Sequence, residues 1–303
     1  MLDILFLGTG ASIPSRDRGM PCVAVRCGGD IVLFDCGEGT QRQMMISPFS
    51  FMKIKGIFIT HMHGDHFLGL PGLLQTMGLS GRKDKLRVYG PEGMSYALGA
   101  VLSACEGNIE YELEIADIRH GEVMEFGGFA VSAFRTDHTV PSLGYKLSEN
   151  DSPGRFNKEK AVKLGLRPGP EFSRLQAGET VRGVTPDMVL GPSRPGCSIV
   201  YSGDTSPCKE LSDAASGADV LIHEATFSGQ ESKLAADHKH STFVQAAEAA
   251  EECGCRALFL VHISNRYEGR ESIEKEATAV FGRTMIPNDM DVYKVSKSDI
   301  RPV

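Results

Sequence analysis

Residues 61–66 read HMHGDH, and this segment constrains the 303-residue chain more than any other. It directly follows IFIT at residues 57–60, a β-branched and aromatic run that predicts a buried strand. Alternate side chains of an extended segment point the same way, so we expect His61 and His63 to share a face. Gly64 is expected to let the chain turn, so that Asp65 and His66 face a second ion. Imidazole and carboxylate ligands in this mixture favour zinc over magnesium or calcium.

Two ions need more ligands than these four side chains, and three later residues are candidates. His138 follows the apolar run Phe129–Arg135, Asp204 follows the run at 198–202, and His262 ends the run at 257–262. Each run predicts a strand, so we expect the three side chains on the same rim as the HMHGDH segment. The predicted ligands of two zinc ions per chain are His61, His63, Asp65, His66, His138, Asp204 and His262. Three further histidines, His120, His223 and His238, are expected to be surface or hydrogen-bonding residues.

Composition places the chain among ordinary globular proteins, with 41% hydrophobic and 23% charged residues. No apolar run approaches the roughly 18 residues needed to span a bilayer, and the first eight residues lack the basic start of a signal peptide. The eight cysteines include no CxxC pair, which indicates thiols in a reducing compartment. We therefore expect a soluble, cytoplasmic protein with no membrane segment.

Strand and helix patterns alternate in both halves of the chain. Strands are predicted at 4–7, 22–26, 31–35, 56–60, 86–89 and Phe129–Arg135, with a helix at about 71–81. The second half adds strands at 198–202, 220–223 and 257–262. Thr242 and Gln245 form a capping-box pattern at the start of an Ala-rich helix that ends at Gly254. These patterns predict an α/β fold, an αββα four-layer sandwich, that occupies residues 1–303 as a single domain.

A different segment lies between the two halves. Residues 153–182 are rich in Gly, Pro and charge, and carry seven basic residues against three acidic ones, although the whole chain has a net charge of −7. Long insertions in a compact domain are usually functional or disordered. We predict a flexible arm inserted at about residues 150–185. Its local positive charge offsets the objection that an acidic chain makes a poor nucleic-acid partner.

The HxHxDH segment with the distant His138, Asp204 and His262 resembles the metallo-β-lactamase superfamily over essentially the whole chain. Asp35, in FDCGEG at residues 34–39, resembles the superfamily's structural aspartate near the site. The resemblance implies the four-layer fold and two zinc ions. It implies that His61, His63 and His138 hold one ion and that Asp65, His66 and His262 hold the other. Asp204 would bridge the two.

Three further features resemble the ribonuclease Z family, the endonucleases that trim the 3′ end of precursor tRNA. HEAT at residues 223–226 and HST at 240–242 resemble paired motifs of that family. The basic insert with GLRPGP at 165–170 is similar to its tRNA-binding arm. GTG at 8–10 followed by PSRDRG at 14–19 is similar to its N-terminal loop, in which arginine here replaces the usual lysine and Gly19 the usual asparagine.

The chemistry of such a site suits phosphodiester hydrolysis. Two zinc ions lower the pKa of bound water to about 7, and the resulting hydroxide attacks while both ions clamp the attacking and leaving oxygens. Asp65 is predicted to accept the proton of the water. His240 is predicted to protonate the leaving group, and Glu224 to orient the imidazole of His240. The predicted products are a tRNA 3′-hydroxyl and a trailer 5′-phosphate.

Positive charge is expected to hold the RNA, because phosphate neutralisation by Lys and Arg dominates such binding. Arg16 and Arg18 are predicted to receive the end of the acceptor stem. The arm residues predicted to bind tRNA are Arg155, Lys158, Lys160, Lys163, Arg167 and Arg174. The resemblance also implies a homodimer in which the arm of one subunit grips tRNA for the other.

Two other functions fit parts of the sequence. A small-molecule phosphodiesterase, an arylsulfatase or a lactonase on the same fold would keep the seven ligands, but it has no need of a basic arm. A non-catalytic RNA-binding scaffold would keep the arm, but it has no need of an intact ligand set.

Overall fold

The structure, a computed structural model, describes residues 1–107, 109–267 and 271–303. The chain forms two compact units. The larger comprises Met1–Ser148 and Cys197–Val303, and the smaller comprises Glu149–Gly196. Within the described residues, no helix is both long enough and apolar enough to cross a membrane.

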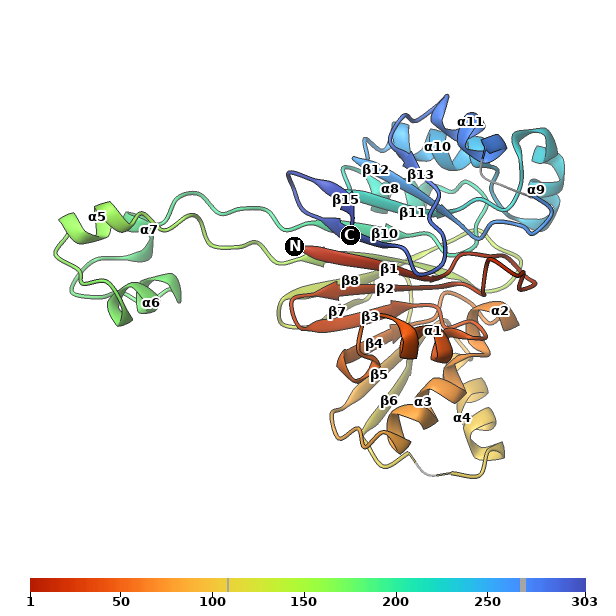
Figure 1. Ribbon diagram of the computed structural model, residues 1–303, viewed down its shortest axis with the longest axis horizontal. Coiled ribbons are helices and arrows are strands. Elements are labelled where there is room, and N and C mark those ends of the chain that lie inside the picture. The colour runs from red at the N-terminus through yellow and green to blue at the C-terminus, as the bar shows by residue number, and fades with distance from the viewer. Residues whose placement is uncertain (108, 268–270) are drawn as a thin grey trace. The chain divides into compact units, whose positions relative to one another are not determined.

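The larger unit contains two mixed sheets, and the first carries the N-terminal strands (Figure 1). Its strands β3, β4, β5 and β6 run parallel to one another. The pairs β14–β1, β1–β2 and β2–β3 are antiparallel. In spatial order the strands are β15 (Ile300–Pro302), β14 (Val292–Val295), β1 (Leu2–Gly8), β2 (Cys22–Cys27), β3 (Asp30–Phe34), β4 (Ile54–Phe58), β5 (Leu86–Gly90) and β6 (Leu113–Asp117).

The second sheet has a parallel half, β10 to β13, and an antiparallel half, in which β9 pairs with β10 and β7 with β8. The spatial order is β13 (Thr284–Met285), β12 (Ala257–Val261), β11 (Val220–Glu224), β10 (Ser198–Tyr201), β9 (Leu143–Glu149), β8 (Phe129–Arg135) and β7 (Val123–Glu125).

Three buried apolar clusters separate four layers. The cluster between the sheets stacks the ring of Phe34 on those of Tyr145 and Tyr201, at centroid distances of 5.9 and 5.5 Å. The second packs helices on the first sheet, and the third packs helices on the second sheet. The central strands therefore bury both faces, which explains the near-continuous apolar runs of the sequence. The predicted αββα fold is confirmed.

Helices cover the outer face of each sheet (Figure 1). On the first sheet they are α1 (Thr40–Ile46), α3 (Leu70–Leu79) and α4 (Met94–Ala104), with the short η1 (Phe51–Lys53) and α2 (Gly64–Phe67). On the second sheet they are α8 (Lys209–Ala215), α10 (Phe243–Glu252) and α11 (Glu271–Thr278), with the short η2 (Gly229–Glu231) and α9 (Ser232–His238) nearby in the sequence.

The smaller unit has its own core rather than the structure of a loop. It contains α5 (Lys158–Lys163), α6 (Pro170–Gln176) and α7 (Pro186–Val189). These helices bury a small apolar cluster made of Ala161, Leu166, Phe172, Leu175, Val181, Val184 and Val189. Two segments of the chain enter and leave this core, and isolated β-bridges pair them, Ser152 with Arg194 and Phe156 with Leu190. The unit therefore extends past the residue 185 expected from composition, because Val189 and Leu190 complete its packing.

Candidate metal centre

The HMHGDH segment leaves the first sheet at the end of a parallel strand. β4 ends at Phe58, but His63 keeps extended dihedrals (φ −67°, ψ 146°), and Nε2 of His61 lies 3.1 Å from Nδ1 of His63. The expected juxtaposition of the two imidazoles is therefore present without a continuing strand. Gly64 is the first residue of α2, so the chain turns here by starting a helix and uses no left-handed glycine.

Asp35 anchors this segment from the neighbouring strand end. Oδ1 of Asp35 accepts hydrogen bonds from the backbone N and Oγ1 of Thr60, at 2.7 and 2.9 Å. Its Oδ2 accepts from Nδ1 of His66 at 2.7 Å and from the hydroxyl of Tyr201 at 2.8 Å. The side chain of Asp35 is fully buried. Its backbone has φ 60°, a strained conformation that these hydrogen bonds offset. Asp35 thus fixes the ring of His66 and the end of the strand that precedes His61.

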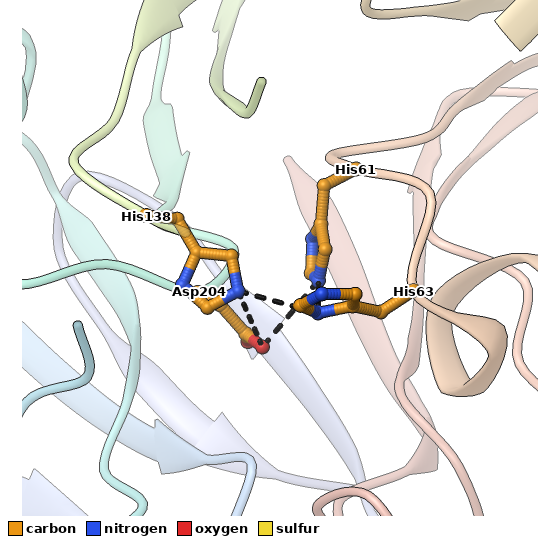
Figure 2. Close-up of side chains that lie close together, drawn as sticks. All are labelled: His61, His63, His138 and Asp204. Atoms are coloured by element: carbon orange, nitrogen blue, oxygen red, sulfur yellow. Dashed lines mark hydrogen bonds and ion pairs between the residues drawn. The ribbon is translucent and has the colours of Figure 1, made fainter. Parts of the chain in front are cut away.

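The first group of candidate ligands joins segments from both sheets (Figure 2). His61, His63, His138 and Asp204 each offer an atom within 4.8 Å of the others. Oδ2 of Asp204 lies 3.6 Å from Nε2 of His61 and 4.0 Å from Nε2 of His138. Nε2 of His138 lies 3.3 Å from Nδ1 of His63.

The second group is Asp65, His66 and His262, again within 4.8 Å of one another. Oδ2 of Asp204 lies 3.3 Å from Nε2 of His66 and 3.4 Å from Nε2 of His262. Asp204 therefore faces both groups. The seven residues singled out in the sequence meet in one place, between the strand ends of the two sheets.

The polar atoms of these residues fit metal ions. Among the described residues, Nε2 of His66, Nε2 of His262 and Oδ1 of Asp204 are buried without a hydrogen-bond partner. Such atoms cost about 1–3 kcal/mol each unless a partner satisfies them. The opposite ring nitrogens are held: Nδ1 of His262 by Oγ1 of Thr226 at 2.8 Å, and Nδ1 of His138 by the carbonyl of Lys239 at 3.0 Å. Imidazoles oriented in this way are typical of metal ligands.

The electrostatics favour the ligand forms of His61, Asp204 and Asp65. Burial lowers the pKa of His66, but the charges of Asp204 and Asp35 outweigh it and hold that pKa well above its usual value. Burial and the nearby His66 lower the pKa of His61, which keeps it neutral. Burial alone would raise the pKa of Asp204, but the charges of His262 and His66 hold it well below its usual value. Burial would also raise the pKa of the Asp65 carboxyl, but a hydrogen bond with His262 and the charge of His66 outweigh it and lower the pKa. Neutral imidazoles and ionised carboxylates are the forms that bind metals.

His240 and Glu224 form a pair beside both groups. Nδ1 of His240 donates to Oε1 of Glu224 at 2.7 Å, and the imidazole centroid lies 5.0 Å from that of His138 and 5.4 Å from that of His262. Burial lowers the pKa of His240, but the charge and hydrogen bond of Glu224 outweigh it and raise the pKa to about 9. His240 is therefore protonated near neutral pH and is able to donate from Nε2. His240 also falls in a third possible ligand group with Asp204 and His262.

The other residues singled out in the sequence belong to neither ligand group. His223 is buried in β11 and bonds the carbonyl of Glu224, His120 receives the backbone N–H of Arg135, and His238 stacks on Phe227, as expected of structural histidines. Arg16 is exposed and lines a cavity of about 750 Å³, whereas Arg18 of the same cavity donates to the carbonyl of Pro287 at 3.0 Å.

The basic side chains of the smaller unit are exposed. Arg174 forms an ion pair with Glu179 at 2.6 Å, and Arg182 forms one with Glu171 at 2.8 Å. Within the described residues, six others have no ion-pair partner: Arg155, Lys158, Lys160, Lys163, Arg167 and Arg194. Sequence patterns did not predict Thr60, Tyr201 and Thr226, since hydroxyls that hold a ligand in place carry no spacing signal.

Comparisons with known proteins agree with this geometry. Residues 2–152 match the family model described as anti-Pycsar protein Apyc1, and residues 161–263 match the beta-lactamase superfamily domain. Ribonuclease Z of Methanosarcina acetivorans is 46% identical over 96% of this chain and 97% of its own length. Ribonuclease Z of Archaeoglobus fulgidus is 45% identical over 98% of each chain.

Among solved structures, human tRNase Z, short form, matches with a TM-score of 0.72 and 29% identity, covering 97% of this chain and 99% of that one. These likenesses extend over nearly the full length of the chain, so they include both sheets and the segments that carry the seven candidate ligands. The chain belongs to the ribonuclease Z family of hydrolases.

Proposed function

We propose that the chain is a zinc-dependent endoribonuclease that removes the 3′ trailer from precursor tRNA, leaving a tRNA 3′-hydroxyl and a trailer 5′-phosphate. The observation that carries the proposal is the His240–Glu224 pair beside two His/Asp groups, in a chain 46% identical to a ribonuclease Z. A phosphodiester has a poor leaving group, so a positioned acid beside the metal groups is the feature that its hydrolysis requires.

Two zinc ions fit the two groups of ligands. His61, His63 and His138 would hold one ion, Asp65, His66 and His262 the other, and Asp204 would bridge them. Bound there, the zinc ions would supply a nucleophilic water at neutral pH and neutralise charge on the phosphate. Oδ2 of Asp65 would accept the proton of that water. Nε2 of His240 would donate a proton to the departing 3′ oxygen of the tRNA, while Glu224 holds the ring at Nδ1.

The smaller unit would bind the body of the tRNA. Five of its exposed cations without an ion-pair partner in the described residues, those from Arg155 to Arg167, are candidates to neutralise phosphates. Arg174 is a weaker candidate because Glu179 pairs with it. Arg16 and Arg18 would meet the acceptor end, with Arg16 the more available of the two. The eight cysteines are thiols, which suits the reducing cytoplasm that we propose as the compartment.

We also propose a homodimer. Helices α1, α3 and α4 expose large apolar side chains: Leu79 is 91% exposed, Tyr96 83%, Met45 62% and Ile46 58%. Large exposed apolar groups on adjacent helices are typical of subunit interfaces. Sedimentation velocity on a Leu79→Asp and Tyr96→Glu double variant is expected to shift a dimer toward monomer. A wild-type protein that sediments as a monomer at micromolar concentration contradicts this proposal.

The decisive experiment incubates the zinc-loaded protein with a precursor tRNA and maps both product ends. We expect a single cut, a 3′-hydroxyl on the tRNA and a 5′-phosphate on the trailer. Asp204→Ala, which removes the residue between the two groups, is the inactive control. If a small phosphodiester or a lactone is hydrolysed while the RNA survives, the small-molecule hydrolase is the correct function instead.

A further inference from the structure

Asp289 lies on the turn between β13 and β14 and bonds a segment 270 residues away in sequence or more. Its Oδ1 accepts hydrogen bonds from the backbone N of Thr9 at 3.0 Å and from Oγ1 of Thr9 at 2.8 Å. Its Oδ2 accepts from the backbone N of Gly19 at 2.6 Å. One carboxylate therefore holds both ends of the loop at residues 9–19.

The neighbouring hydrogen bonds close the base of this loop. Gly10 donates to the carbonyl of Gly19 at 2.9 Å, and the Nη1 of Arg18 donates to Oγ1 of Thr9 and to the carbonyl of Pro287. A Cβ added at Gly19 would lie 3.2 Å from Oδ2 of Asp289. A side chain at this position would therefore have to displace the carboxylate of Asp289 by a few tenths of an ångström.

The backbone of the loop bonds one ligand of the second group and the residue that follows another. The N–H of Ser12 donates to Oδ2 of Asp65 at 2.9 Å. The carbonyl of Thr9 accepts from the N–H of Ile263 at 3.0 Å, directly after His262. His262 itself sits at φ 55°, so its conformation depends on such neighbouring hydrogen bonds. Loop 9–19 therefore links Asp289 by hydrogen bonds to Asp65 and to the residue after His262.

We propose that Asp289 is a positioning residue that acts through loop 9–19 on the second metal group, Asp65, His66 and His262. This inference rests on the proposed metal function. Asp289 touches none of these ligands; it fixes the loop whose backbone bonds Asp65 directly and holds His262 through Ile263. Removing a hydrogen bond behind a metal ligand typically changes metal affinity or activity by about 10–100-fold. The first group, His61, His63 and His138, receives no such hydrogen bond from the loop in the described residues.

The test measures the affinity of each of the two zinc ions by competition with a chelator, for wild type, Asp289→Ala and Thr9→Val. We expect Asp289→Ala to weaken one ion by about 10–100-fold and to leave the other unchanged. Thr9→Val removes the hydrogen bonds of the Thr9 hydroxyl with Asp289 and Arg18 but keeps that of the backbone N–H, so we expect a smaller effect on the same ion. The kcat for precursor tRNA should also fall. Asn288→Ala is the matched control, because Asn288 bonds Asp291 through its backbone groups and should leave both affinities at the wild-type value.

Selectivity for one ion is the readout that a merely structural residue would not give. Equal weakening of both ions, or wild-type affinity for both in Asp289→Ala, overturns the inference while leaving the proposed function intact. A wild-type protein that binds no zinc refutes the metal function itself, and the two failures are thereby distinguished. If Asp289→Ala is unfolded by circular dichroism, the Thr9→Val affinities decide: an unchanged pair of values also overturns the inference.

Discussion

At the scale of single residues, the surroundings of His240 fit two possible roles, that of a general acid and that of a metal ligand. Its Nδ1 is committed to Glu224, yet its ring lies among His138, His262 and Asp204. If His240 is the acid, His240→Ala should slow cleavage of precursor tRNA by about 10²–10⁴-fold, the usual contribution of general acid–base catalysis. The zinc content of the His240→Ala variant should stay at the wild-type value. Single-turnover cleavage and metal analysis of the same preparation check this, and loss of an ion would instead make His240 a ligand.

The partner of His240 provides a second check on the same role. Glu224 accepts from His240 and Thr205 at Oε1 and from the N–H and hydroxyl of Thr226 at Oε2. Glu224→Gln places an amide N–H₂ against donors at one of these sites, so the imidazole loses its orientation. We expect slowed turnover with zinc retained, to a smaller degree than in His240→Ala. Glu251→Gln, on the exposed face of α10, is the control and should be fully active.

Asp219 offers a prediction about stability far from the metal groups. The buried carboxylate accepts from Arg256 at 2.7 Å, Lys297 at 2.6 Å and the N–H of Ser198 at 2.8 Å. Burial alone would raise the pKa of Asp219, but the hydrogen bonds from Lys297 and Arg256 outweigh it and lower the pKa. A lowered pKa in the folded state stabilises the protein above the unfolded pKa of about 3.9, and this stabilisation is lost as the pH falls through the folded value.

We therefore expect Asp219→Asn to lower the free energy of unfolding by about 1–3 kcal/mol at pH 7. The gap between variant and wild type should narrow as the pH falls from about 4 toward the lowered pKa of the folded state, because the unfolded chain then binds a proton that the folded carboxylate does not. Urea denaturation at a series of pH values measures the gap. A gap that stays constant down to about pH 3 would mean that packing, not charge, is what the substitution removes.

At the scale of elements, α10 shows how the sequence sets up the acid. Thr242 accepts from the N–H of Gln245 at 3.1 Å, and Oε1 of Gln245 accepts from the N–H of Thr242 at 2.9 Å. This capping box fixes the start of α10, shortly after His240. Thr242→Ala is expected to cost about 0.5–2 kcal/mol, measured by denaturation. Turnover should fall less than in His240→Ala, since the ring keeps Glu224; a loss as large would mean that the cap itself sets the position of the acid.

Element patterns were also the part of the structure that the sequence predicts best. Runs such as Ala257–Val261 are apolar on both faces, which predicts central strands, and the Thr242–Gln245 cap predicts a helix start. Candidate metal ligands directly after such strands are predicted to lie together at one rim of the fold, and all seven do. The hydroxyls of Thr60, Tyr201 and Thr226 could not be predicted, because their roles depend on hydrogen bonds between residues that are distant in sequence. The core of the smaller unit was not predicted because its apolar residues are few and widely spaced among charges.

At the scale of the whole molecule, the smaller unit separates RNA binding from chemistry. Gly154 and Gly191 approach closely, and the N–H of Gly191 donates to the carbonyl of Arg155 at 3.0 Å, so a short Gly-Ser turn can replace residues 155–190 without straining the larger unit. The seven metal-ligand candidates, His240 and Glu224 all lie outside the deleted segment. We expect this variant to lose cleavage of precursor tRNA and to keep wild-type turnover of a small phosphodiester.

Charge is the physical reason for that split, and a matched variant isolates it. Changing Lys158, Lys160 and Lys163 to Gln removes three exposed cations and leaves the apolar core of the unit in place. Every cation–phosphate pair that is removed lowers the slope of log affinity against log salt by about 0.7–0.9, so the triple variant should flatten the slope by about 2–3. Filter binding of precursor tRNA between low and moderate salt measures the slope.

If the triple variant binds and cuts tRNA like wild type, while the deletion does not, the shape of the unit rather than its lysines holds the RNA. Equal loss of tRNA and small-substrate turnover in the deletion would show that residues 155–190 support the fold of the larger unit.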